Sequence, residues 1–215
     1  MASPAAPVDL SPLPVRDRPL SRFAQLIGGL ALYGTSLALM VRAELGLSPW
    51  SVLDQGIALR AGWSLGTASA ITGVGVLLAW LPLRQRPGIG TVANVVLIAI
   101  SLDAVLAVLP EARGPASQVL FCVAGVVLNG LATASYVGAR LGPGPRDGLM
   151  TGLHARTGKS VRACRTTIEI GVLASGWLLG GTVGVGTVLY AATIGPITQA
   201  CLRFTAVRVK KDLRP

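Results

Sequence analysis

Two acidic residues lie inside long apolar stretches of the sequence. Asp103 falls within residues 87–110 and Glu169 near the start of residues 166–202, and both stretches are otherwise uncharged. A carboxylate at the centre of a membrane span costs about 2.5–3.5 kcal/mol, so such groups are usually partnered or functional. Arg165 precedes Glu169 by four residues and can pair with it on one helix face. Asp103 has no such neighbour, and we expect it to face the bundle interior, near residues of the second copy of the repeat described below, and to couple a proton or a cation.

Uncharged polar residues extend this predicted site. Asn94 precedes Asp103 on the same stretch, and Tyr190 and Gln199 occupy the matching positions 96 residues later. Such side chains either line a pathway or form hydrogen bonds between helices, and both interpretations remain open. The predicted ligand or ion pathway consists of Asn94, Asp103, Glu169, Tyr190 and Gln199.

Two short linkers carry a second group of polar residues. In each, a proline precedes about ten residues of helical pattern, which is too short to span a bilayer. These helices are either interfacial, lying at the headgroups, or re-entrant, with a positive N-terminus aimed at anions. Arg146 either pairs with its neighbour Asp147 or holds an anionic ligand. The linker residues singled out are Pro49, Trp50, Asp54, Pro145, Arg146 and Asp147.

The composition indicates a membrane protein with several spans. Of the 215 residues, 52% are hydrophobic and only 13% are charged, whereas a soluble domain carries about 25% charged residues. A helix needs about 20 apolar residues to cross a bilayer. The last apolar stretch is long enough for two helices separated by the glycine-rich residues 180–186. We therefore predict six spans, within residues 23–41, 61–83, 87–110, 114–139 and, as two helices, 166–202.

The basic residues predict the orientation of these spans. With six spans and both termini in the cytoplasm, all of the 19 Lys and Arg residues except Arg42, Arg60 and Arg113 face the cytoplasm. The net charge of +10 then indicates contact with an anionic inner leaflet, and we expect no nucleic-acid partner. Three cysteines without a CxxC pair and a single histidine predict no metal site. We expect no cofactor and, because no catalytic dyad is visible, no enzyme.

The chain repeats itself at an offset of 96 residues, because residues 29–64 align without a gap on residues 125–160. Each copy holds three predicted spans, an odd number, so the copies must lie in opposite orientations, as in many secondary transporters. We predict an all-α membrane fold of two inverted three-helix repeats, each with one short interfacial or re-entrant helix. The predicted parts are a flexible cytoplasmic tail (1–22), the two repeats (23–110 and 114–204) and a basic cytoplasmic tail (205–215). Glycines predict close-packed seams between the copies: Gly28, Gly29, Gly34, Gly125 and Gly130.

Five motifs in a fixed order resemble the YczE family of bacterial integral membrane proteins. They are PWSVLDQG (49–56), GIGT (88–91), GPGPRDGLM (142–150), RTTIEIG (165–171) and GVGT (184–187). The resemblance extends from Arg22 to about Phe204. It implies the family's fold and a location in the bacterial inner membrane, but no established substrate.

Two classes of function remain open for such a membrane protein. The first is a small transporter or channel-like protein that passes an unidentified small solute between the copies, which the inverted repeats favour. The second is a non-transporting factor that assists an enzyme or assembly through the basic segment 140–165 at the cytoplasmic face. A substrate-binding subunit of a larger transporter lies between the two. Stabilisation by a solute would identify a transporter, whereas co-purification with a protein partner would identify the factor.

Overall fold

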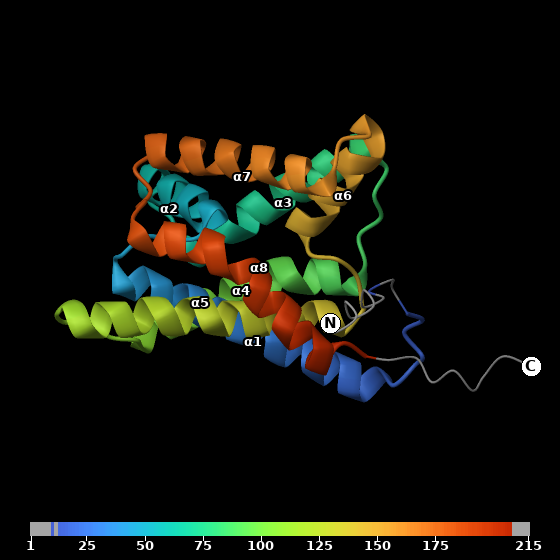
Figure 1. Cartoon of the computed structure of the whole chain (residues 1–215), viewed down its shortest axis with the longest axis horizontal. Helices are drawn as coiled ribbons and strands as arrows, with labels where there is room; N and C mark the ends of the chain where they lie inside the picture. Colours follow the sequence, from blue (N-terminus) through green and yellow to red (C-terminus); the bar gives the residue numbers. More distant parts are fainter. Residues whose placement is uncertain (1–9, 11–12, 208–215) are drawn as a thin grey trace, which may run out of the picture.

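The computed structural model describes residue 10 and residues 13–207, and these residues contain helices and no strands. Short loops join the helices, which pack along one another (Figure 1). The helices of this described part are α1 (Pro19–Ala43), α2 (Pro49–Ala61), α3 (Leu65–Leu83), α4 (Ile89–Val108), α5 (Pro115–Gly138), α6 (Pro145–Thr157), α7 (Val161–Leu178) and α8 (Val185–Thr205).

Five of the described helices, α1, α3, α4, α5 and α8, are long and apolar enough to cross a membrane. The remaining long helix, α7, has 18 residues and carries Arg162, Arg165 and Glu169, which lower its hydropathy. α2 and α6 have 13 residues each and so extend about 20 Å. This is too short for about 30 Å of hydrocarbon. The chain is therefore a helical protein with several apolar spans.

The helices repeat at the offset seen in the sequence. The helices of the first half, α1 to α4, begin at residues 19, 49, 65 and 89, and those of the second half, α5 to α8, begin at residues 115, 145, 161 and 185. Each pair of starts differs by 96 residues. Pro begins α1, α2, α5 and α6, where its missing N–H is not needed. Ser64 and Ser160 cap α3 and α7 by accepting from the backbone N–H three residues later.

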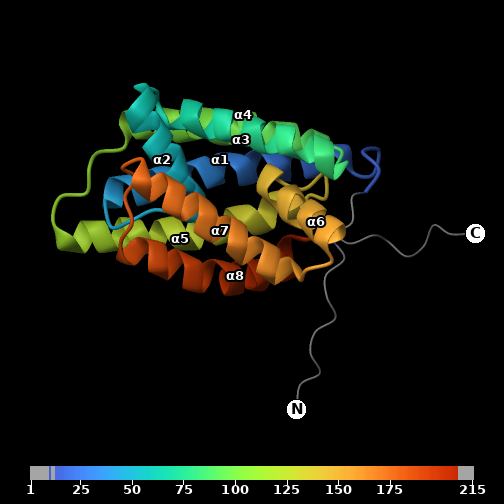
Figure 2. The same cartoon turned by 90° about the horizontal axis from the view of Figure 1, so that it is seen from above.

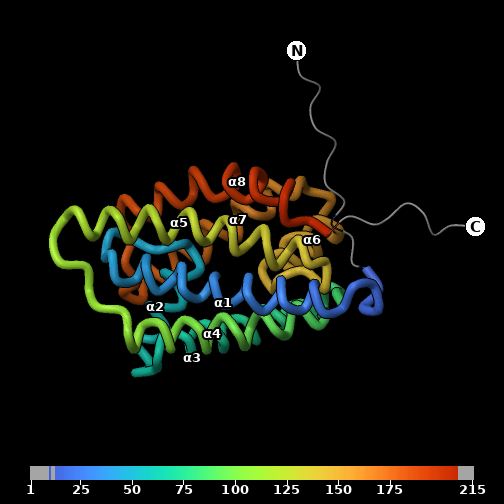
Figure 3. The backbone as a smooth tube through the Cα atoms, turned by 90° about the horizontal axis from the view of Figure 1, so that it is seen from below, coloured from blue at the N-terminus to red at the C-terminus, as the bar shows by residue number. Residues whose placement is uncertain are grey.

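The eight helices of the described residues form two layers. Figure 3 shows α4, α1, α5 and α8 side by side in this order, and α1 packs against both α4 and α5. The second layer contains α3, α2, α6 and α7 (Figure 1). Figure 2 shows the two short helices between the flanks formed by α4 and α8. α2 packs against α7 and α6 against α3, so each short helix contacts a long helix of the other half.

One end of the molecule, here called the near end, holds the start of α1 together with the ends of α5 and α8. There, Gln25 Nε2 donates to the carbonyl oxygens of Ser135 and Thr205 at 2.8 and 2.7 Å. The start of α4 is at the same end, because Gly90 N donates to Leu141 O at 3.0 Å. α1 and α4 therefore start where their matching helices, α5 and α8, finish.

The opposite, far end holds the ends of α1 and α4 and the start of α8. Gly186 N donates to Leu45 O at 2.7 Å, which joins the start of α8 to the loop after α1. Arg42 donates to Leu106 O at 2.7 Å, which joins the ends of α1 and α4. Matching helices of the two halves thus run in opposite directions along the bundle (Figure 1).

The chain before α1 differs from the prediction of a flexible tail as far as residue 22. α1 begins at Pro19, and Arg22 is fully buried within its first turns. The Arg22 guanidinium donates to the carbonyl oxygens of Pro14 and Ala139 at 2.7 and 2.8 Å. These bonds fasten the described segment 13–22 to the end of α5. Residues 1–9, 11–12 and 208–215 of the two predicted tails lie outside the described residues.

Two of the five glycines predicted as seams lie between the halves. A methyl group on Gly29 of α1 would lie 2.9 Å from Tyr136 N, and one on Gly125 of α5 would lie 2.9 Å from Ser36 O. Both positions therefore let α1 and α5 approach closely. The others differ from the prediction: Gly34 meets α4, Gly130 meets α8, and Gly28 has no atom within 4 Å of an added methyl group.

Neighbouring glycines of α1 offer a matched test of this seam. Gly29→Ala should destabilise the protein by about 1–3 kcal/mol, because its methyl group is forced against the backbone of α5. Gly28→Ala meets open space and should leave the stability equal or slightly higher, since Ala favours helix more than Gly. Thermal unfolding in detergent measures both. Equal melting temperatures for the two variants would show that the α1–α5 contact tolerates extra volume.

Candidate functional site

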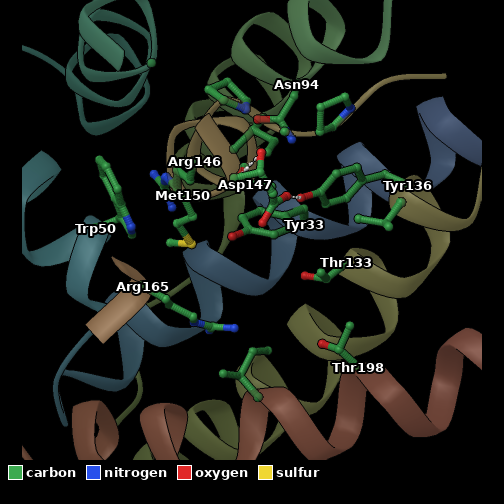
Figure 4. A pocket seen from close by; sticks show the side chains of 18 of the residues that line it. Tyr33, Trp50, Asn94, Thr133, Tyr136, Arg146, Asp147, Met150, Arg165 and Thr198 are labelled. Atoms are coloured by element: carbon green, nitrogen blue, oxygen red, sulfur yellow. Dashed lines mark hydrogen bonds between the residues drawn. The ribbon is translucent and has the colours of Figure 1, made fainter. Parts of the chain in front are cut away.

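The N-termini of the two short helices meet inside the bundle. The guanidinium carbon of Arg146, at the start of α6, lies 4.8 Å from the centre of a Trp50 ring at the start of α2. Arg146 Nη2 lies 3.3 Å from Asp54 Oδ2, one turn further along α2. The Asp54 side chain is 1% exposed and that of Arg146 is 24% exposed. A largely buried ion pair and a cation–π contact therefore connect the two halves. Figure 4 shows Arg146 and Trp50 at this place.

Packing against the long helices holds the short helices in this position. Trp80 of α3 covers Gly148 of α6, and its Nε1 donates to Pro145 O at 2.9 Å. The matching contact lies on the other side of the bundle, where Gly176 of α7 packs against the α2 backbone at Val52. At the 96-residue offset, Gly176 corresponds to Trp80 and Val52 corresponds to Gly148, so the large residue and the glycine have changed places. At each contact, a glycine lets the helix axes approach. The exchange of large and small residues explains why both short helices can point inward.

A cavity of about 810 Å³ lies next to these N-termini. Its aromatic side chains come from both halves, as do its polar and charged ones (Figure 4). It extends to the loop between α3 and α4 at the near end, where Gln85 and Arg86 line it. The volume is within the range of about 300–1,000 Å³ that is usual for small-molecule sites. Its principal lining residues are Tyr33, Trp50, Asn94, Tyr136, Arg146, Asp147, Arg165, Glu169, Tyr190 and Gln199.

Most of the predicted pathway residues come together in this cavity. Asn94, Glu169, Tyr190 and Gln199 all line it. The predicted pair is confirmed, because Arg165 Nε donates to Glu169 Oε1 at 2.8 Å. Pairing neutralises the two charges that α7 carries at the cavity.

Asp103 lies elsewhere, which differs from the expectation that it faces the second copy. Its carboxylate accepts from Ser64 Oγ at 2.6 Å and from Gly66 N at 2.8 Å, so it caps the start of α3 in its own half. It follows Asn94 by nine residues, or about 14 Å of helix, which places it toward the far end. Asp103 therefore does not join the polar cluster.

The linker residues lie at the cavity, but Arg146 and Asp147 do not pair with each other as one interpretation of the sequence predicted. Pro49, Trp50, Pro145, Arg146 and Asp147 line the cavity, and the fully buried Asp54 lies behind Arg146. Arg146 does not pair with its neighbour Asp147 but with Asp54 of the other half. Asp147 instead accepts from the Tyr136 hydroxyl at 3.0 Å. Asp54 and Asp147 thus have separate partners, Arg146 and Tyr136.

Sequence reasoning missed a polar chain on α1 and α5. Tyr190 Oη donates to Asn129 Oδ1 at 3.0 Å, and Asn129 Nδ2 donates to Ser36 Oγ at 2.8 Å. Tyr33 and Tyr136 pack edge to face with their centres 6.1 Å apart. The sequence does contain a signal for the position of Tyr33. This residue follows the seam glycine Gly29 by four residues and therefore lies on the same helix face, toward α5.

The comparisons with known proteins agree with this membrane assignment. The chain is 40% identical over 181 residues to an uncharacterized protein of Haemophilus influenzae, with 84% of this chain and 83% of that one covered. It is 35% identical, at the same coverage, to the uncharacterized membrane protein YczE of Bacillus subtilis. Residues 20–203 match DUF6198, a family of unknown function. The chain belongs to this YczE-like family.

The DUF6198 match covers nearly all of the eight helices, so the motifs of both halves belong to the family region. The uncharacterized protein YyaS of Bacillus subtilis is a weaker relative, 24% identical over 75% of this chain and 82% of its own length. No solved structure matches the chain significantly. With the apolar helices, these relatives identify a polytopic membrane protein.

The position of Asp103 predicts a structural role for its carboxylate. Asp103→Ala removes the acceptor for Gly66 N and should cost about 1–2 kcal/mol of stability, as loss of a helix cap does. Asp103→Asn keeps an acceptor oxygen and gains a donor toward Ser64, so it should remain within about 0.5 kcal/mol of the wild type. Denaturation in detergent gives both values. An Asn variant as unstable as the Ala variant would require a role for the charge itself.

Proposed function

We propose that this chain is a small transporter or channel-like protein of the bacterial inner membrane, with its polar site between two inverted repeats. The observation that carries the proposal is the central cavity, where the N-termini of the two short helices meet and both halves supply polar side chains. Sites at the repeat interface, built from interrupted helices, are typical of secondary transporters. A binding site for a small solute follows from this arrangement, and we propose no catalytic step.

Six spans are proposed, with α7 as the fifth in chain order. The charges that lower its hydropathy include Arg165 and Glu169, which line the cavity and pair with each other, and pairing lowers the cost of charge within a span. The opposite directions of the matching helices, such as α1 and α5, support the inverted arrangement. α2 and α6 are proposed to be re-entrant, because Trp50 and Arg146 in their first turns contact each other between the two halves.

The charge distribution supports cytoplasmic termini. Arg84, Arg86 and Arg140 lie in the loops of the near end, whereas the far end has Arg42, Arg60 and Arg113. α6 and α7 are joined at the near end by a segment that adds Arg156, Lys159 and Arg162. The positive-inside rule therefore assigns the near end to the cytoplasm.

The two flanks of the bundle are not equivalent, which supports alternating access. α3 packs along α4, where Gly73 faces Val95. The matching helices α7 and α8 stand apart, with the side chains of Glu169 and Tyr190 lining the cavity between them. Repeats of one ancestry can exchange such arrangements, so that one flank opens as the other closes.

The alternative is a non-transporting factor or a substrate-binding subunit. The basic segment 140–165 at the near end, where α6 ends with several exposed residues, is the surface such a factor would use. A stable protein partner that co-purifies through this segment would favour the alternative. If the chain purifies without a protein partner, the cavity favours transport.

Paired linker positions test the inverted topology. Ser64 and Ser160 are caps, so their exposed neighbours Trp63 and Lys159, also 96 residues apart, are better labelling sites. In a chain whose three cysteines are replaced by serine, Trp63→Cys should react with an impermeant maleimide in intact cells. Lys159→Cys should react only after permeabilisation. Labelling of both from one side would refute the inverted arrangement.

Gly195 on α8 tests the role of the cavity. It lines the cavity, and a methyl group added to it meets no atom within 4 Å. Gly195→Phe should fill part of the space and lower solute uptake into proteoliposomes by about tenfold or more, since losing about 1.4 kcal/mol of solute contacts suffices. Gly195→Ala is the matched control and should keep most uptake. Uptake of a metabolite mixture, read by mass spectrometry, measures both; equal uptake by Phe and Ala variants would place the pathway elsewhere.

A further inference from the structure

Arg146 has more hydrogen-bond donors than partners. A guanidinium carries five N–H groups and accepts nothing. Among the described residues, its one hydrogen bond is from Nη2 to Asp54 Oδ2, and its side chain is 24% exposed to the cavity. The remaining donors therefore face a space that a solute can enter. A group rich in acceptor oxygens, such as a carboxylate, can satisfy several of them at once.

The surroundings of Arg146 add further donors. Trp50, whose ring lies against the guanidinium, is 6% exposed, and its indole Nε1 has no acceptor among the described residues. The first turn of α6 has glycine at its N-cap and so lacks the side-chain cap that Ser48 gives α2. These groups and the positive end of α6 all favour an anion. The aromatic walls of Tyr33 and Tyr136 favour an apolar body attached to it.

Asp54 is the group with which such an anion must compete. The carboxylate is fully buried on α2, and Arg146 is its ion-pair partner. α3 supplies no charge to it but places the hydroxyls of Ser69 and Thr72 beside it. The other charged residues that line the cavity are Asp147 on α6, the paired Arg165 and Glu169 on α7, and Arg86 and Arg140 in the loops of the near end. Asp54 therefore depends on Arg146 for its charge.

We propose that the cavity binds a small monocarboxylate with an apolar body through Arg146, and that Asp54 takes up one proton as this solute binds. This inference rests on the proposed function and specifies its substrate class and coupling ion. The solute's carboxylate displaces the Asp54 carboxylate from the guanidinium. A buried carboxylate without a partner is costly, so an Asp54 oxygen binds a proton that enters the cavity from the bulk solvent. The neutral acid then donates its O–H to a neighbouring hydroxyl.

The charge balance explains what coupling would achieve. The incoming anion brings one negative charge, and the proton on Asp54 brings one positive charge. The site therefore holds the same net charge before and after binding, which avoids adding a charge to the bundle interior. The solute and the proton bind together and leave together.

Binding to the purified full-length chain in detergent tests the substrate class. Benzoate and phenylacetate should bind, whereas benzamide and phenylacetamide, which match them in shape without the charge, should bind at least about tenfold more weakly. Inorganic phosphate, which lacks an apolar body, should bind more weakly than phenylacetate. Arg146→Gln should lose carboxylate binding, and Arg60→Gln at the far end is the control that should keep it. Equal binding of the acids and their amides would overturn the assignment of an anion site.

The pH dependence of phenylacetate affinity tests the coupling. Between about pH 6 and 8 the solute itself stays ionised, so uptake of one proton should weaken its affinity by about tenfold per pH unit of increase. Asp54→Asn should remove this slope, with an affinity at pH 8 at or above that of the wild type, because no carboxylate competes for Arg146. Glu111→Gln, an exposed acid at the far end, should keep the slope.

The pH dependence of phenylacetate affinity can be measured on the wild-type protein alone. The test therefore does not depend on whether Asp54→Asn folds. A wild-type affinity that does not change with pH would overturn the proton coupling. Proton-linked carboxylate binding without uptake into vesicles would support this inference and refute the transporter function. Uptake of uncharged solutes without any carboxylate binding would refute this inference and leave the transporter function standing.

Discussion

The ion pair between Asp54 and Arg146 is the contact around which the two halves are organised. A charge inside an apolar bundle is stable only beside its counter-charge, so the starts of α2 and α6 must meet. Their approach requires glycine at Gly148 and Gly176, where a side chain would collide with the helix opposite. It also requires α1 and α5 to pack closely enough to close the opposite layer. The cavity beside the pair follows from these constraints.

Duplication supplies a symmetric backbone, but the side chains of the site are not symmetric. Trp50 in the first half corresponds to Arg146 in the second, and Asp54 corresponds to Met150. Each short helix therefore brings a different half of one interaction: α2 the carboxylate and the ring, α6 the guanidinium. The same divergence places the Arg165–Glu169 pair on α7 alone. One chemically polarised cavity results, where exact repetition would have placed like groups against each other.

The sequence predicted the helices well because their signals are local. Apolar stretches, prolines at helix starts and the 96-residue offset are all read within one segment, and α2 and α6 begin at the predicted prolines. The partners of the polar residues were less predictable, because they depend on which helices meet. Arg146 is next to Asp147 in the sequence, yet its ion-pair partner is 92 residues away. Asp103 lies deep in an apolar stretch, and that depth does not reveal that its carboxylate caps α3.

The buried Arg22 and the partly buried Arg146 show why residue type does not by itself identify a binding group. Arg22 is fully buried, and its guanidinium donates to five backbone carbonyl oxygens, those of Leu13, Pro14, Asp17, Ala139 and Arg140. Its donors are saturated by fixed backbone, so it can only hold the chain in place. Arg146 meets a single carboxylate and faces the cavity with donors to spare. The number of fixed acceptors around each guanidinium therefore distinguishes the two roles. An arginine with all donors bonded to backbone stabilises the fold, whereas one with unbonded donors can exchange its partner for a solute.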